Sequence, residues 1–443
     1  MMPQPVLSDL AALLCIASIL MIPLAVAGLS LINTGLGRAR SASQMILSSL
    51  CVFGVAALVY FAFGFAWQGY PGGPGYQMFV AGRGWSWIAN SSFFLRNISF
   101  DGSPASLASL FGIFSVALAA VIPLGSGTER WRLGAACAST ALFAGWTYPL
   151  FAHWVWGGGW LAQLGTGAGL GRGFVDAGGS GTIQAVGGLT ALSIAWILGP
   201  RYGKYTVEGM PSAIPGHNSV LVLFGCLLTL IGWLGLNSAG SVLLNGVELG
   251  QVIKVILNTT LCASAAGLMA AAFTYVRFGK PDASLTANGW VGGLAASSAA
   301  CAFVVPAEAV VIGGIAGGLV ILSVEWLELR LSVDDPSGSV SVHGVAGLWG
   351  ILAVGLFGRF PSSAATGASG APAGQWLAQL VGIATLIGFV LPLTYGLNWL
   401  LDRFYPLRVS PEGERQGMDL YELGAGAYPE FVTHSEEFMQ RKL

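Results

Sequence analysis

Two polar residues stand inside long apolar stretches of the chain, and they are the first candidates for chemistry. Asp176 lies in VDAGGSGTIQAVGG, residues 175–188, and His343 lies in SVSVHGVAGLWGIL, residues 339–352. Small residues surround both of them and leave space beside their side chains. Because an ionisable group inside a membrane segment is costly, each one is a candidate for function.

Asp176 has two compatible interpretations. In the first, it caps the amino-terminal end of an apolar helix that begins near residue 180, because a carboxylate there accepts hydrogen bonds from free backbone N–H groups. In the second, its negative charge orders the mouth of a cation-binding site. The sequence allows both roles at once.

His343 also has two interpretations. A lone histidine in an apolar helix is usually an interior residue held by a hydrogen bond. A neutral imidazole, however, offers one donor and one acceptor, which suits a residue that lines a path for a small polar solute. The surroundings of His343 contain only small and apolar residues. Both interpretations stay open at this point.

Trp156, in HWVWGGGW, ends the predicted span that precedes the first of these segments. Tryptophan commonly marks the membrane interface. Its indole face can also hold a small ammonium-like cation, for about 0.5–2 kcal/mol. Three other ionisable residues have simpler interpretations. These are His153 at the interface, Glu308 in an outer loop and Lys254 directed toward the headgroups.

Composition indicates the class of protein. The 443 residues are 54% hydrophobic and 9% charged, with a mean hydropathy of +0.72. Water-soluble proteins carry about 25% charged residues, so the chain is predicted to be an all-α integral membrane protein. The net charge of −1 offers no basic face for nucleic acid. Six cysteines lie in or beside apolar runs without a CxxC pair, which indicates neither a disulfide framework nor a zinc site.

Apolar runs of about 20 residues are long enough to cross a bilayer as helices. Eleven such runs are predicted, at residues 9–33, 45–67, 105–125, 133–155, 180–199, 218–237, 249–276, 287–305, 308–330, 340–358 and 374–400. The first lacks a basic flank and a cleavage site, so we expect a retained helix rather than a signal peptide. The chain would thus divide into a membrane domain, residues 1–400, and a cytoplasmic tail, residues 401–443.

The distribution of positive charge predicts the orientation. Placing the C-terminus inside assigns 14 of the 19 Lys and Arg residues to the cytoplasm and four to the outside, with Lys254 within a span. Loops rich in Lys and Arg stay in the cytoplasm. The sequence therefore predicts an N-terminus outside and a C-terminus inside.

Six stretches of the chain resemble the Amt/Rh/Mep family of ammonium transporters, and they occur in that family's order. They are TERWRLGA, YPLFAHWVWGGGWLAQLG, DAGGSGTIQAVGG, GWLGLNSAGS, SVDDPSGSVSVHGVAGLWG and QGMDLYELGAGAYPEF. Together they extend over nearly the whole chain. The resemblance is to a bacterial, Amt-like member of the family.

This resemblance implies a homotrimer in the membrane lipid, with one pore in each subunit. Each subunit would consist of two inverted, pseudo-symmetric five-helix halves and a final C-terminal helix. It also implies an outer vestibule where ammonium is recruited, with Trp156, Ser241 and Asp176 as the residues in this chain. A P-II type regulatory protein could bind at the cytoplasmic face.

Farther along the implied pore, the chain departs from the family pattern. The family has two stacked phenyl rings as a gate and two histidines beyond it. We choose Phe114, ahead of Phe111, as the first ring, and Leu236 stands at the position of the second. Trp233, in the same stretch as Leu236, is expected to be structural.

Equal spacing locates the two histidine positions. Asp176 precedes Gln184 by eight residues, and Asp335 precedes His343 by eight. The resemblance makes Asp335 the structural mate of Asp176 in the second half, and it makes Gln184 the position of the first family histidine. An amide has no titratable site near neutral pH. Gln184 therefore cannot join an ordinary proton relay, although it can form a hydrogen bond with His343.

These observations predict transport of ammonium or ammonia through a narrow apolar pore in the inner (plasma) membrane, with an altered mechanism or selectivity. Two alternatives stay open: an ammonium sensor with little or no flux, and a channel for neutral ammonia. An enzyme is not expected, because the four histidines are scattered without ligand spacing and no nucleophile–base pair is present. No cofactor and no metal are expected.

Overall fold

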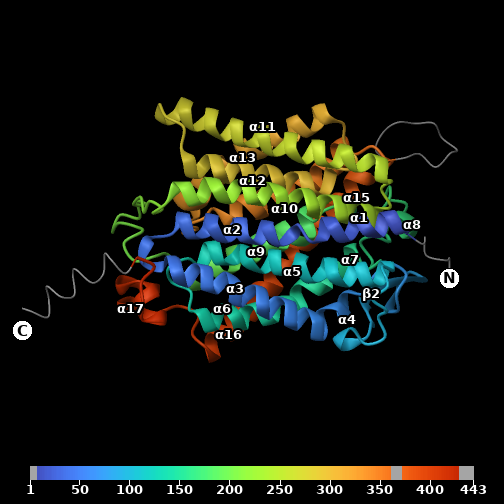
Figure 1. Cartoon of the computed structure of the whole chain (residues 1–443), viewed down its shortest axis with the longest axis horizontal. Helices are drawn as coiled ribbons and strands as arrows, with labels where there is room; N and C mark the ends of the chain where they lie inside the picture. Colours follow the sequence, from blue (N-terminus) through green and yellow to red (C-terminus); the bar gives the residue numbers. More distant parts are fainter. Residues whose placement is uncertain (1–6, 361–371, 429–443) are drawn as a thin grey trace, which may run out of the picture.

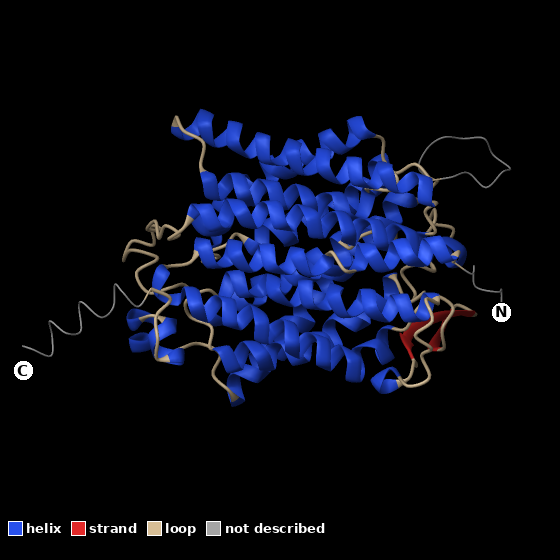
Figure 2. Cartoon of the chain, viewed as in Figure 1, coloured by secondary structure: helices blue, strands red, loops and turns tan. Residues whose placement is uncertain are grey.

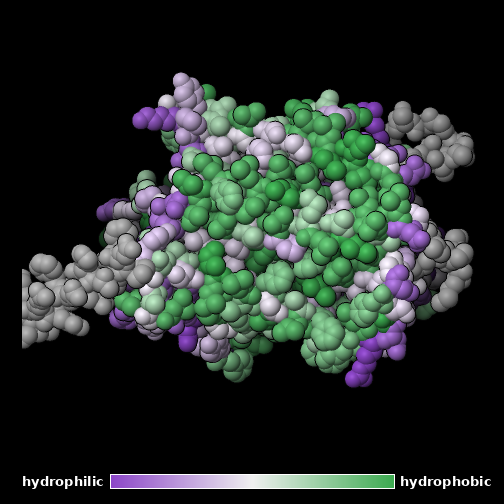
Figure 3. Space-filling model, viewed as in Figure 1, coloured by the Kyte–Doolittle hydropathy of each residue, from purple (hydrophilic) through white to green (hydrophobic). Residues whose placement is uncertain are grey.

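The long helices of the molecule run side by side along one axis (Figure 1). The computed structural model describes residues 7–360 and 372–428. The first helix, α1 (Asp9–Ile19), begins at one end of this bundle, and the tail helix α17 (Pro411–Gln416) lies at the other. Figure 3 shows apolar residues across the middle of one face of the bundle and hydrophilic residues mainly toward its two ends. This distribution is expected of helices that cross a membrane.

The α-helices follow the order of the chain. Up to residue 198 they are α1, α2 (Ile22–Leu36), α3 (Ala42–Val59), α4 (Phe65–Gln68), α5 (Pro104–Gly127), α6 (Leu133–Leu142), α7 (Tyr148–Val155), α8 (Leu164–Ala168) and α9 (Val186–Leu198). Beyond it they are α10 (Ser219–Asn245), α11 (Val252–Phe278), α12 (Ala283–Ala300), α13 (Pro306–Leu331), α14 (Ala346–Phe357), α15 (Gln375–Thr385), α16 (Leu391–Phe404) and α17.

Short turns of other helix types join or precede several of these helices. The π-helical turns are η2 (Tyr60–Gly64), η4 (Phe143–Thr147), η5 (Ser180–Ala185), η7 (Val340–Val345), η8 (Leu386–Val390) and η9 (Asp419–Leu423). The 3₁₀ turns are η1 (Ala39–Ser41), η3 (Phe93–Leu95) and η6 (Leu249–Gln251). π-helical turns often occur at functional sites, and η5 and η7 hold the two residues of greatest interest, Gln184 and His343.

Within the part of the chain that the structure describes, nine helical segments are long and apolar enough to cross a membrane. They coincide with nine of the predicted spans. The predicted spans at 133–155 and 287–305 are also largely helical, as α6–η4–α7 and α12, but polar residues such as His153 and Asn288 make them less apolar. The chain is therefore a multi-pass, mostly helical membrane protein.

The all-α prediction needs one correction. Strands β1 (Gly75–Val80) and β2 (Arg83–Ala89) form an antiparallel hairpin at one end of the bundle, drawn in red in Figure 2. Aromatic and β-branched residues favour strands here. The two residues of the turn, Ala81 and Gly82, both have positive φ, at 51° and 74°. That turn geometry matches the natural twist of a hairpin.

Helix α10 is longer than its predicted span. The prediction ended it at residue 237, but the helix continues to Asn245 and stops at Gly246, which has a φ of 64°. A glycine in the left-handed region is a common helix terminus. Ser241 therefore lies within the last turns of the helix rather than in a loop.

The η5–α9 and η7–α14 segments cross at two glycines with almost no space between them. A Cβ added to Gly188 would overlap the backbone of Gly344, and a Cβ added to Gly347 would lie 2.6 Å from the Ser180 carbonyl oxygen. Small residues allow this backbone contact between membrane helices. The crossing brings the middle of the first half against the middle of the second.

A buried ion network fixes the loop that leads into η7. The Arg201 guanidinium donates to both carboxylate oxygens of Asp334, at 2.9 and 3.0 Å, and to Glu129 at 2.7 Å. Arg130 donates to the Asp334 carbonyl oxygen at 2.7 Å. Burial alone would raise the pKa of Asp334, but the charges of Arg130 and Arg201 and the hydrogen bonds from Arg201 lower it to about 2.

We predict that Gly188→Ala destabilises the protein while Gly318→Ala does not. The new methyl group at Gly188 meets the backbone of Gly344, whereas nothing lies within 4 Å of a Cβ at Gly318. Overpacking of this kind costs about 1–3 kcal/mol. The measurement is the melting temperature of each purified variant in detergent. Equal melting temperatures would contradict the close crossing.

We predict that Asp334→Asn destabilises the protein by on the order of 2 kcal/mol at neutral pH. The folded pKa of about 2 is below the unfolded value. The contribution is therefore complete above about pH 3.9 and is lost only as the pH falls through about 2. The stability difference from wild type should stay constant between about pH 8 and pH 5. Glu412→Gln, at an exposed position, is the control; a difference that shrinks over this range would refute the network.

Candidate functional site

The centre of the site is a hydrogen-bonded pair formed across the helix crossing. His343 Nδ1 lies 2.7 Å from Gln184 Oε1, and the two residues are 4% and 0% exposed. Because the amide oxygen accepts, Nδ1 carries the imidazole proton and Nε2 is left as an acceptor. The Gln184 Nε2 amide group has no hydrogen-bond partner among the described residues. The pair thus keeps one donor group and one acceptor unused.

A capping aspartate starts each of the two helical segments that carry the pair. Asp176 Oδ2 accepts from the N–H groups of Gly181 and Thr182, at 3.0 and 2.8 Å. Asp335 Oδ2 accepts from the Val340 N–H at 2.7 Å. In both halves the N–H group belongs to the residue five positions after the aspartate. The structure thus shows the capping role for Asp176, and it shows the same role for Asp335.

The same glycine position recurs in the two caps. Gly179 follows Asp176 by three residues and has a φ of 98°, and Gly338 follows Asp335 by three and has a φ of 68°. Both values favour glycine, because a Cβ is strained in that region. Ser126 completes the second cap by donating to Asp335 at 2.7 Å. The symmetry predicted from the eight-residue spacing therefore extends to backbone conformation.

Trp156 is held in place by the backbone of the first cap. Its indole Nε1 donates to the Asp176 carbonyl oxygen at 2.8 Å, and the ring is 4% exposed. The ring that packs against it is Phe111, with centroids 5.5 Å apart and planes at 66°. Phe114 instead contacts Phe53, at 6.2 Å. The structure thus brings Phe111, and not our chosen Phe114, next to the tryptophan.

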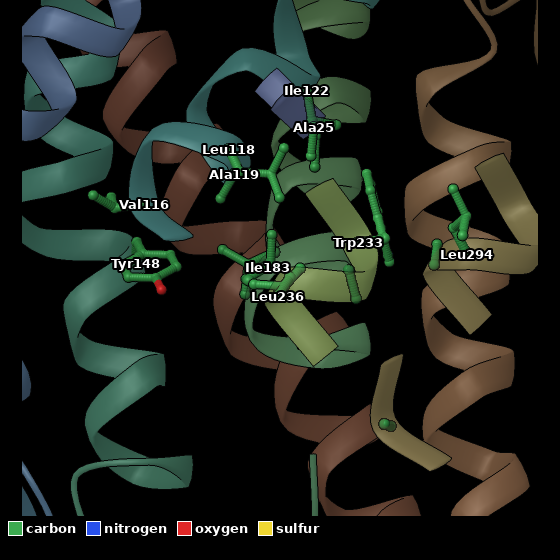
Figure 4. Close-up of a cluster of buried hydrophobic side chains, with 14 of the residues drawn as sticks. Ala25, Val116, Leu118, Ala119, Ile122, Tyr148, Ile183, Trp233, Leu236 and Leu294 are labelled. Carbon is green, nitrogen blue, oxygen red and sulfur yellow. The ribbon is translucent and has the colours of Figure 1, made fainter. Parts of the chain in front are cut away.

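Leu236 and Trp233 belong to the buried apolar cluster. Both are fully buried on α10, and Figure 4 shows Leu236 beside Ile183, the residue before Gln184. The Trp233 indole donates to the Ser298 hydroxyl on α12 at 3.0 Å. This bond ties α10 to α12.

Ser241 contacts a cysteine rather than Trp156 or Asp176. Its hydroxyl is 3.9 Å from the Cys301 thiol, and both residues are buried. Trp156 and Ser241 are not hydrogen-bonded to each other in the described structure. Hydrogen bonds therefore join Gln184 to His343 and Trp156 to Asp176, whereas Ser241 contacts Cys301. Ser241 still lies close to the first cap, because a Cβ added to its neighbour Gly240 would lie 2.3 Å from the Ala177 carbonyl oxygen.

Cavities lie toward both ends of the bundle. One of about 370 Å³ is lined by Ala108, one turn before Phe111 on α5, and by Val242, which follows Ser241. Another of about 160 Å³ is lined by Ser341 and Asp335. The first therefore lies between α5 and the end of α10, and the second adjoins the segment that carries His343.

Two glutamines that the sequence did not single out hold the loop before Asp176. Gln379 donates to the Val175 carbonyl at 2.9 Å and accepts from its N–H at 2.9 Å. Gln375 donates to the Gly173 carbonyl at 2.8 Å and accepts from the Arg172 N–H at 2.9 Å. Both are fully buried on α15. Their spacing of four residues in QWLAQL puts them on one helix face, which was the available signal.

Two other ionisable residues from the sequence analysis, His153 and Glu308, have structural contacts. His153 Nδ1 bonds the Gln68 carbonyl at 2.8 Å, and its Nε2 bonds Ser86 at 3.0 Å. Glu308 accepts from the Val305 N–H at 2.9 Å, which caps α13. His434 lies outside the described residues. Within those residues, no group of three or more His, Cys, Asp or Glu could hold a metal ion.

We predict that Gln379→Leu loosens the loop at residues 172–175. It leaves the Val175 N–H and carbonyl without partners, and each buried polar group left unpaired costs about 1–3 kcal/mol. Trypsin cleavage after Arg172, followed by mass spectrometry, should become faster, and the melting temperature should fall. Gln77→Leu, on the exposed strand β1, is the matched control. Unchanged cleavage in Gln379→Leu would contradict the role of this glutamine.

Comparison with known proteins finds ammonium transporters by both family and sequence similarity. The model of the Ammonium Transporter Family matches residues 12–428. The ammonium transporter Amt2 of Archaeoglobus fulgidus is 37% identical over 421 residues, which cover 93% of this chain and 86% of that protein. Ammonium transporter 1 member 1 of Solanum lycopersicum is 32% identical over 414 residues, which cover 88% of this chain and 82% of that protein.

Solved structures show the same relationship. A protein described as a sensor Amt protein aligns with a TM-score of 0.83 and 29% identity, covering 94% of this chain and 98% of that chain. Mep2 of Saccharomyces cerevisiae aligns with a TM-score of 0.76 and 26% identity, covering 91% and 89%. From the family match over nearly its whole length, the chain belongs to the ammonium transporter family.

Proposed function

We propose that this chain transports ammonium or ammonia across the cytoplasmic (inner) membrane. The observation that carries the proposal is the buried Gln184–His343 pair, a polar contact at the crossing of two helical segments. Polar residues buried within membrane-spanning helices are costly, so this pair is a candidate for lining a solute path. Cavities toward both ends of the bundle fit such a path. The relatives are named as transporters and not as enzymes.

The proposal includes eleven spans in two inverted halves, with the N-terminus outside and a membrane domain over residues 1–400. The nine apolar helices and the two less apolar ones support that number. The two caps support the inversion. Asp335 adjoins Asp334 and Arg201 at the same end as the tail, whose Glu414 accepts from the Tyr202 N–H at 2.5 Å. Asp176 lies near Trp156, toward the end with the hairpin.

Recruitment of ammonium is proposed at Trp156, in the outer vestibule. An indole face attracts a small cation, and Phe111 at its edge adds a second ring. Asp176 contributes by orienting Trp156 through its carbonyl oxygen, since its carboxylate is occupied by the cap. Ser241 is retained as a further vestibule residue. The gate is proposed at Phe114 and Leu236, and Phe111, which packs against Trp156, is a second candidate for the first ring.

Assembly and regulation are proposed at the membrane faces and the tail. We propose a homotrimer in the membrane lipid, as in the family. We propose that the tail, residues 401–443, is cytoplasmic. In its described part, Asp419 accepts from the Gln44 N–H at 2.7 Å and Glu422 accepts from the Leu133 N–H at 3.0 Å. These bonds fix the tail at helix starts, where a P-II type regulatory protein could reach it.

We predict that the chain restores growth on low ammonium to a bacterial host that lacks its own ammonium transporters. Trp156→Leu should raise the ammonium concentration needed for half-maximal growth several-fold, because lost cation–π binding of about 0.5–2 kcal/mol weakens recruitment. Trp326→Leu, at an exposed position on α13, is the matched control. Absence of growth by a protein that is present in the membrane and binds ammonium would instead favour the sensor, which the similarity to a sensor Amt protein makes the second candidate.

A further inference from the structure

Three positively charged side chains line one cavity, which we call the basic cavity. Its volume is about 520 Å³, and its charged lining residues are Arg172, Lys254, Arg359 and Glu248. They come from separate segments. Arg172 follows α8, which Figure 1 places at the same end of the bundle as strand β2. Glu248 follows α10, Lys254 is in the first turn of α11, and Arg359 follows α14. Positive charge is therefore in excess in this cavity.

Two of the three cations have no carboxylate partner. The ion pairs among the described residues include neither Arg172 nor Lys254. Arg359 pairs with Glu308 at 2.6 Å, and Glu308 is not one of the residues that line the cavity. Like charges that line one cavity repel one another, and an anion bound between them offsets that repulsion. The basic cavity therefore suits a negatively charged ligand.

The uncharged lining residues supply further donors and an aromatic surface. The amide side chains are Asn245 and Gln251, and the rings are Phe303 and Phe360, with centroids 4.6 Å apart. The Arg172 guanidinium lies over the Phe360 ring, 5.5 Å from its centroid, and this contact orients it. Arginine binds phosphate through parallel N–H groups, and lysine binds it as a point charge. The set of donors therefore favours a phosphate group.

The basic cavity also lies where lipid phosphate groups are expected. Lys254 is half-buried near the start of an apolar helical segment, Leu249–Phe278, that is long enough to cross a membrane. Its neighbours Ile253 and Leu257 are exposed, as expected of side chains that face lipid. A lysine near the end of such a helix extends its ammonium group toward the headgroups. A lipid phosphate could therefore reach the cavity from the side.

We propose that the basic cavity binds a phosphate-type anion, held by Arg172, Lys254 and Arg359. The phosphate belongs to a lipid headgroup or is free in solution, since both present the same oxygens to these donors. The inference goes beyond the proposed function. It concerns a part of the molecule other than the Gln184–His343 pair, and it does not depend on whether the chain conducts.

The test follows the melting temperature of the purified full chain in detergent during a titration with phosphatidic acid, whose headgroup is a bare phosphate. A ligand that binds only the folded protein raises this temperature. We expect phosphatidic acid to stabilise the wild type, and phosphatidylcholine to do so much less, because its choline cation meets the excess positive charge. The double variant Arg172→Gln/Lys254→Gln should need at least about tenfold more phosphatidic acid for half the effect.

The matched control is Arg83→Gln/Arg96→Gln. It removes the same charge at two exposed positions that do not line the cavity, so the titration should stay as in the wild type. Arg172→Gln alone, also at an exposed position, repeats the test if the double variant does not fold, and it should weaken the response several-fold.

A parallel titration with inorganic phosphate at constant ionic strength distinguishes the two sources. Stabilisation by inorganic phosphate that Arg172→Gln/Lys254→Gln loses would identify a free anion, and stabilisation by phosphatidic acid alone would identify a headgroup. Equal responses of the cavity variant and the control variant would overturn the inference. So would a wild type that responds equally to phosphatidylcholine and phosphatidic acid, or that responds to none of the three compounds.

Discussion

The backbones of η5–α9 and η7–α14 touch at Gly188 and Gly347, and the other site residues take their positions from this contact. Gln184 and His343 each lie four residues before one of these glycines. The crossing therefore sets both side chains at one depth, within the 2.7 Å of their hydrogen bond. A larger residue at either glycine would separate the helices and break the pair, although neither glycine has any chemistry of its own.

Helices that begin inside a membrane need partners for their first N–H groups, because lipid supplies none. Asp176 and Asp335 meet that need with the same contact in each half. Their negative charge is therefore used by the backbone and is not free to hold a cation alone. Asp176 still affects the vestibule, because its carbonyl oxygen fixes the Trp156 indole. One residue thus links helix initiation to the orientation of an aromatic ring.

Much of this arrangement could be predicted from the sequence, because hydropathy and spacing are local signals. The apolar runs located the helices, and the repeated eight-residue spacing paired Gln184 with His343 before any contact was known. The phenylalanine that packs against Trp156 could not be predicted in this way. Phe111 and Phe114 are three residues apart and share a helix face, so only tertiary packing places Phe111 at Trp156.

The hydrogen bonds that Gln375 and Gln379 form with the backbone of residues 172–175 were not predicted, for a related reason. Gln375 and Gln379 bind backbone groups about 200 residues earlier in the chain, and backbone groups carry no residue-specific pattern. The β1–β2 hairpin was not predicted because its short strands lie in the segment between two predicted spans. Hydropathy identifies that segment only as too polar to cross the membrane. These contacts are long-range or depend on backbone conformation, which composition does not report.

An amide in place of an imidazole separates two properties that a histidine pair combines. Hydrogen-bond geometry is kept, because Gln184 still reaches His343 and still leaves a polar group free. Proton affinity is not kept, because the amide has no basic site near neutral pH. Binding of a neutral polar solute requires only the first property, and movement of charge requires both. Hydrogen bonding and proton affinity therefore depend on different atoms of the pair. The substitution Gln184→Glu replaces the amide nitrogen with an oxygen of similar size. It adds a titratable group next to His343 without changing the glycines at the helix crossing.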